Sequence, residues 1–94
     1  MKTRKEINQI LIQKNKGLFI YAQVLLDILD ERNGQNVAMT VQQIADLFNL
    51  TRSVSRKKIA DLTEIEVIYS REVEGFYVLS ASPLPEKIKT LHLV

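Results

Sequence analysis

The chain has 94 residues and a mass of 10.8 kDa, which is the size of one domain and excludes a multidomain enzyme. Hydrophobic residues make up 46% and charged residues 26% of the sequence, which is typical of a globular domain and too apolar for disorder. Cysteine is absent and the one histidine is His92, so disulfides, thiolate metal sites and multi-histidine metal sites are excluded. We therefore expect no metal, no cofactor and no enzymatic activity.

The sequence also bears on location. No run of 18 apolar residues occurs in it, so no membrane-spanning helix is expected. The basic start, residues 1–6, leads into a mixed segment and not into an apolar one, so we expect no secretory signal. These observations favour a cytoplasmic protein.

Charge is arranged in blocks, although the net charge is only +2. Residues 51–60 hold four basic side chains and no acidic one, a net of +4, between acidic stretches at 17–50 (net −3) and 61–75 (net −4). The four basic residues are Arg52, Arg56, Lys57 and Lys58. Such a block suits contact with a polyanion over a small surface, and the alternative is an ordinary solvated helix face.

The first part of the chain predicts two helices and a short strand. Thr3 and Glu6 have the spacing of a capping box, which opens a helix over about 4–15. Residues 18–32 are apolar on more than one face, so this second helix is expected to be central and buried. The apolar run 37–39 predicts a brief strand.

Two further helices follow, joined by a short turn. Thr40 and Gln43 form a second capping box, which opens a helix that ends at Phe48. Asn49 then breaks the pattern, because asparagine tolerates a positive φ. Thr51 is the expected N-cap of the next helix.

That next helix, 51–63, carries Ser55, Ile59 and Leu62 at i, i+4 and i+7, which is the spacing of one inward face. It is expected to end near Thr63 or Glu64.

A β-hairpin and a tail complete the chain. A β-rich segment begins at residues 67–69, turns at 74–75 and returns over 76–79. The tail, residues 81–94, fits a short helix or a strand, and its periodicity does not separate the two. The elements are thus helix, helix, small strand, helix, helix, two-stranded hairpin and tail.

Two stretches carry a resemblance to a known family: TVQQIADLFNLTRS at 40–53 and KKIADLTEIEVI at 57–68. With the hairpin that follows, the segment 40–79 resembles the winged helix-turn-helix superfamily of bacterial transcription regulators. The resemblance implies that Ala45 is the small residue where the two helices cross, and that Leu50 is the turn residue that plugs the core.

The implied fold is mainly α with a small β-hairpin (α+β), a single domain over 1–94 with a winged core at 18–80. An extra N-terminal helix (4–15) and a C-terminal tail (81–94) lie outside this core. The chain departs from the family at three positions. Asn49 and Glu66 stand where the family usually has glycine, and Ser55 stands where it usually has a buried β-branched residue.

Helix 51–63 has the features of a helix that reads the major groove of DNA. Arg52 and Arg56 lie one helical turn apart, and the arginine fork donates two parallel hydrogen bonds to guanine. The residues expected to contact DNA are Thr40, Gln42, Thr51, Arg52, Ser53, Arg56, Lys57, Lys58 and Arg71.

Phosphate contacts are expected from hydroxyls, an amide, a lysine and the free backbone amides at the helix start. These side chains are Thr40, Gln42, Thr51, Ser53 and Lys58. Arg71 is the only cation of the hairpin, and Glu72 and Glu74 flank it. Deep insertion of this acidic tip into the minor groove is therefore not expected.

The function that these features favour is sequence-specific binding of double-stranded DNA by a small homodimeric transcription regulator. They favour a repressor over an activator. One alternative is a winged-helix module that binds a protein, and another is an accessory protein of plasmid or phage replication. No small-molecule ligand is evident from the sequence.

The apolar residues of 4–15 and 81–94 suggest a dimer interface. The alternative is that both segments pack on their own chain. Lys2, Arg4 and Lys5 offer a third possibility, a basic arm that follows the DNA backbone.

Overall fold

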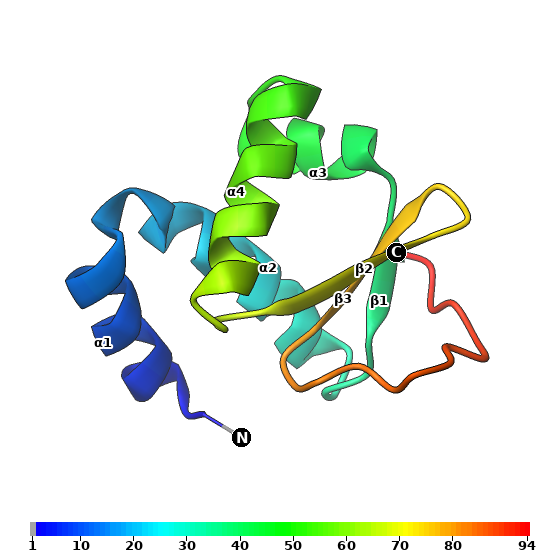
Figure 1. Cartoon of the computed structure of the whole chain (residues 1–94), viewed down its shortest axis with the longest axis horizontal. Helices are drawn as coiled ribbons and strands as arrows, with labels where there is room; N and C mark the ends of the chain where they lie inside the picture. The colour runs from blue at the N-terminus through cyan, green and yellow to red at the C-terminus, as the bar shows by residue number, and fades with distance from the viewer. Residues whose placement is uncertain (1) are drawn as a thin grey trace.

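The computed structural model describes residues 2–94, which contain four α-helices, one 3₁₀ turn and three strands (Figure 1). Met1, the first residue of the expected 1–94 domain, lies outside the described residues. The elements are α1 (Arg4–Lys14), η1 (Lys16–Leu18), α2 (Phe19–Glu31), β1 (Val37–Met39), α3 (Val41–Phe48), α4 (Arg52–Glu64), β2 (Tyr69–Val73) and β3 (Phe76–Ser80). The expected class, helices with a small antiparallel sheet, is confirmed.

Three of the helices have a threonine as the N-cap residue. The hydroxyls of Thr3, Thr40 and Thr51 each accept the backbone N–H three residues ahead, at 3.2, 3.1 and 3.3 Å. The side chains of Glu6 and Gln43 in turn accept the backbone N–H groups of Thr3 and Thr40, so both predicted capping boxes are present. The bonds from Thr3 lower the pKa of the Glu6 carboxyl. Local side-chain chemistry therefore sets where these helices start.

The three strands form one antiparallel sheet in the order β1-β3-β2. Glu74 and Gly75 make the hairpin turn with φ of 52° and 84°, as a two-residue hairpin turn requires. The tail forms neither a helix nor a full strand. It contributes one parallel bridge, in which the N–H of Ala38 donates to His92 O (2.8 Å) and that of Val94 to Ala38 O (3.3 Å).

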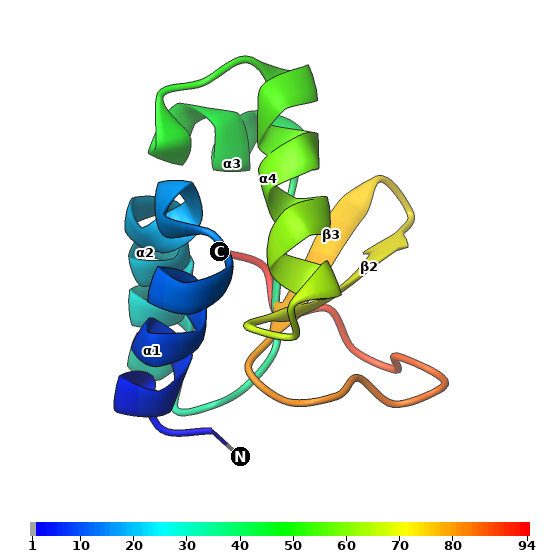
Figure 2. The same cartoon turned by 60° about the vertical axis from the view of Figure 1, so that its left-hand side comes forward.

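The core lies where α1, α2 and α4 meet the sheet. α1 and α2 run side by side, and α4 lies between them and the β2–β3 hairpin (Figure 2). The burial predicted for the second helix is confirmed for one face, where Leu25 and Leu29 are buried, whereas Ile20 is exposed and α4, not α2, has the central position (Figure 2). Ile7 and Leu11 of α1 are buried in the same core cluster. Within the described residues, every helix is too short or too polar to span a bilayer.

The N-terminal segment is held on its own chain. The Arg4 guanidinium donates to Gln23 (2.8 Å), Asp27 (3.1 Å) and Asp30 (2.6 Å) of α2. Lys2 Nζ donates to Glu66 O at 3.2 Å. Arg4 is thus fixed on the acidic face of α2 and is not part of a basic arm, whereas the buried face of α1 agrees with packing on the same chain. Whether the protein also dimerises stays a prediction.

The end of α4 corrects the expected start of the second strand. Glu66 has φ 58°, and in this left-handed turn its N–H donates to Thr63 O and that of Val67 to Leu62 O. Because the N–H of Val67 closes the helix, it is not available to a β-ladder. The strand therefore begins at Tyr69 and not at Val67.

We expect Glu66→Gly to raise the free energy of unfolding by about 0.5–1 kcal/mol. Relief of the left-handed strain gains about 1–2 kcal/mol, and the extra backbone entropy that glycine loses costs about 0.5–1 kcal/mol. Urea denaturation measures the difference. As a control, Glu64→Gly in the last turn of α4 should lower stability by about 0.5–1 kcal/mol. A Glu66→Gly protein no more stable than its parent would contradict this account.

Candidate nucleic-acid interface

The turn between α3 and α4 places α4 at the surface. Asn49 has φ 56°, as predicted for the residue that ends α3, and the N–H of Leu50 donates to Ala45 O at 3.1 Å. Ala45 is buried, and Leu50 packs against the core. The chain therefore reverses within three residues, and Thr51 caps the helix that follows.

The rotational setting of α4 agrees with the predicted one. Ser55, Ile59 and Leu62 are buried. The buried hydroxyl of Ser55 donates to Thr51 O at 2.8 Å, so serine fits a position where an apolar residue is usual. The outward side chains are all exposed, and they are Arg52, Ser53, Arg56, Lys57 and Ala60.

Two of the outward cations have acidic partners. Arg56 Nη1 lies 3.2 Å from Glu72 Oε1 of β2 and 3.4 Å from Tyr77 Oη of β3. Lys57 Nζ lies 2.6 Å from Asp61, one turn along the same helix, and this bond raises the pKa of Lys57. The surface of α4 is therefore less positive than its sequence indicates.

The remaining two cations of α4 differ in their surroundings. Lys58 is half-buried, and its ammonium lies 5.3 Å from the centre of the Tyr21 ring of α2. It is directed towards α2 and not outward. Arg52, at the first position of the helix, is exposed and has no hydrogen-bond or ion-pair partner among residues 2–94.

The hairpin presents an acid to α4 and turns its cation away. Alternate residues of a strand point to opposite faces, and Ser70 and Glu72 contact Thr63 and Arg56 of α4. Arg71 lies on the other face, where its guanidinium donates to the backbone oxygens of Pro85 (2.6 Å) and Glu86 (3.1 Å) in the tail. Arg71 is thus directed to the tail and away from α4, and the DNA contact expected from it stays a prediction.

The two expected residues of α3 lie at its start. Thr40 uses its hydroxyl oxygen as the N-cap acceptor, and Gln42 Nε2 donates to Asp46 at 2.8 Å. The structure therefore gathers Thr51, Arg52, Ser53, Arg56 and Lys57 on the first turns of α4, and it leaves Thr40 and Gln42 on a separate helix.

Glu72 and Tyr77 are the site residues that sequence reasoning missed. They are direct partners in the β2–β3 register, and burial, followed by a hydrogen bond that the Tyr77 hydroxyl donates to the Glu72 carboxylate, raises the pKa of Tyr77. The signal was present in the sequence, because a two-residue turn at 74–75 pairs residue 72 with residue 77. Only the docking of this face against α4 lay beyond the local pattern.

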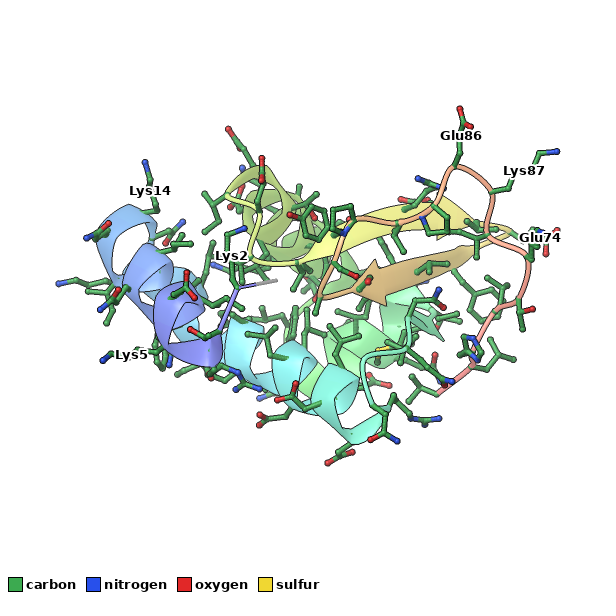
Figure 3. The ribbon with its side chains drawn as sticks, turned by 90° about the horizontal axis from the view of Figure 1, so that it is seen from below. Lys2, Lys5, Lys14, Glu74, Glu86 and Lys87 are labelled. Carbon is green, nitrogen blue, oxygen red and sulfur yellow. The ribbon has the colours of Figure 1, made fainter. Side chains whose placement is uncertain are left out.

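The basic block at the N-terminus lies apart from the hairpin. Lys2, Lys5 and Lys14 lie at the α1 end of the molecule, and Glu74 lies at the opposite end with the tail residue Lys87 (Figure 3). The lysines of α1 therefore do not extend the surface formed by the hairpin tip.

Comparison of the chain with protein-family models, with curated proteins and with solved structures finds no significant match. The resemblance to the winged helix-turn-helix superfamily therefore rests on the residues and element order of this chain alone.

We expect Arg71→Ala to loosen the tail. Loss of about 1 kcal/mol of charge-assisted hydrogen bonding should speed amide hydrogen exchange at Ala38 and Val94, whose N–H groups join β1 to the tail, by about fivefold. Lys87→Ala, an exposed change in the same tail, is the matched control and should leave both amides protected. Unchanged exchange in the Arg71 variant would mean that its contacts with the tail do not hold it.

Proposed function

We propose that this protein is a winged helix-turn-helix protein that binds double-stranded DNA, with α4 lying in the major groove. The observation that carries the proposal is the exposed start of α4. Arg52 and Ser53 lie there beside the free backbone amides of the first turn, Arg56 follows one turn later, and no acidic residue of the helix occurs before Asp61. A helix that reads the major groove contacts bases with its N-terminal residues.

The element order supports the winged part of the proposal. A strand precedes the two helices α3 and α4, and a hairpin follows them, with β1 paired to β3 in the same sheet. Asn49 and Glu66, which stand at the two positions where the resemblance implies glycine, both have a positive φ. The backbone thus meets the family requirement without the family residue.

The start of α4 offers two kinds of contact. The N–H groups of Arg52 and Ser53 have no acceptor inside the helix, and together with the helix dipole they suit a phosphate oxygen. The arginine side chains suit the O6 and N7 acceptors of guanine. Phosphate contacts would fix the register, and arginine contacts would read the bases.

The ion pair of Arg56 does not exclude this role. Arg56 and Glu72 are 50% and 59% exposed, and a surface pair of this kind contributes at most about 1 kcal/mol. A bidentate arginine–guanine contact contributes about 1–3 kcal/mol of discrimination. The contact with DNA therefore outweighs the pair, and no such cost arises for Arg52, which has no partner among residues 2–94.

The biological role that follows is a small homodimeric regulator of transcription in the cytoplasm, which represses by occupying an operator. A replication accessory protein would use the same chemistry. A second candidate, a module that binds a protein, is favoured by one observation, the mixed charge of the α4 surface in the pairs Arg56–Glu72 and Lys57–Asp61.

Selection of bound sequences from a random duplex pool tests the function. We expect the selection to recover a defined sequence, which is palindromic if two copies bind. The logarithm of the binding constant should fall linearly with the logarithm of salt concentration, with a slope of about −0.9 for each phosphate neutralised. Recovery of no sequence, with affinity for duplex DNA insensitive to salt, would overturn DNA binding and favour the protein-binding module.

Arg52→Ala is expected to cost about 1–3 kcal/mol of binding to the selected duplex and to relax preference at particular base pairs. Lys87→Ala removes an equal charge from the tail and should have little effect, because Lys87 is not on α4. Binding is measured by fluorescence anisotropy at fixed salt. Equal losses in the two variants would show that only net charge matters.

A further inference from the structure

One acidic residue of the hairpin, Glu72, is held in a defined contact with α4. Glu72 and Tyr77 are cross-strand partners, and both contact the Arg56 guanidinium, at 3.2 and 3.4 Å. The Arg56 guanidinium carbon also lies 5.9 Å from the centre of the Tyr77 ring. Two strands of the hairpin therefore position one side chain of α4.

The contact uses only part of the arginine fork. Both hydrogen bonds involve Nη1 of Arg56, and its Nη2 and Nε have no partner among residues 2–94. A guanidinium held at one nitrogen loses fewer orientations when its remaining donors bind a base, so less entropy is lost on binding. The arrangement thus suits an orientation-dependent acceptor.

The negative charge of Glu72 weakens the binding of Arg56 to DNA phosphates. Attraction between arginine and phosphate is a large electrostatic term that does not depend on base sequence. A carboxylate 3.2 Å from Arg56 offsets that attraction and repels nearby phosphate oxygens. Sequence-independent binding is therefore weakened more than a directed contact with a base edge.

We propose that Glu72 and Tyr77 are positioning residues that determine specificity, because they direct Arg56 to a base edge and away from the phosphate backbone. This inference rests on the proposed DNA-binding function. It makes the hairpin a modulator of α4 and not a DNA contact of its own, in keeping with the withdrawal of Arg71 to the tail.

The test compares Glu72→Gln with Glu74→Gln in the full chain. Both changes remove one negative charge from the hairpin, but Glu74 lies in the turn and has no bond to Arg56. Affinity is measured for the selected duplex and for a scrambled duplex of equal length, over a range of salt concentrations. The ratio of the two affinities is the specificity readout.

We expect Glu72→Gln to tighten binding to the scrambled duplex by about three- to tenfold and to lower the specificity ratio by about threefold or more. The salt slope on that duplex should steepen by about 0.9, since Arg56 then neutralises one more phosphate. Glu74→Gln should tighten both duplexes by a similar factor and leave the ratio unchanged. Tyr77→Phe should lower the ratio without a change of charge.

An Arg56→Ala background separates positioning from a general charge effect. In it, Glu72→Gln should leave the specificity ratio unchanged, because Glu72 acts through Arg56. Equal shifts of both duplexes by Glu72→Gln and Glu74→Gln in the parent chain would overturn the inference and leave the proposed function standing. Failure of the parent chain to bind the selected duplex in a salt-dependent manner would overturn both.

Discussion

The packing of one face of α4 against the core is the constraint on which the candidate surface depends. Ser55, Ile59 and Leu62 are buried, and serine is accommodated because its hydroxyl bonds to the backbone one turn earlier. A helix with one face fixed cannot rotate, so the outward position of Ser53 and Lys57 follows from burial on the opposite side. The buried residues of α4 thus determine which of its side chains are exposed.

The features that the sequence predicts well are those decided by near neighbours. The capping threonines, the turn at Asn49 and the inward face of α4 each depend on residues at most one or two turns away. Glu66 marks the limit of this reasoning. Its positive φ agrees with the glycine position of the family pattern, yet its effect on the next strand depends on bonds that only the folded helix end reveals.

The features that the sequence does not predict arise where separate elements dock. The pairing of Arg56 with Glu72, the position of Lys58 over Tyr21 and the contact of Arg71 with the tail join elements that are distant along the chain. Strand alternation places Arg71 and Glu72 on opposite faces, but it does not say which face meets α4. That choice is made by burial of the hairpin against the core, which no local pattern encodes.

The docking also changes what the +4 block of residues 51–60 means. Of its four cations, Arg56 and Lys57 have acidic partners, Lys58 lies over an aromatic ring, and Arg52 has no partner in the described part of the chain. The long-range field of such a surface is weaker than the field that the +4 charge of residues 51–60 alone would produce. Its attraction for a duplex of arbitrary sequence is therefore weak. Short-range contacts to base edges are affected less, because they depend on donor geometry. For the proposed function, the acidic hairpin therefore lowers total affinity while preserving discrimination between sequences, and two copies on adjacent half-sites would restore the affinity that one domain lacks.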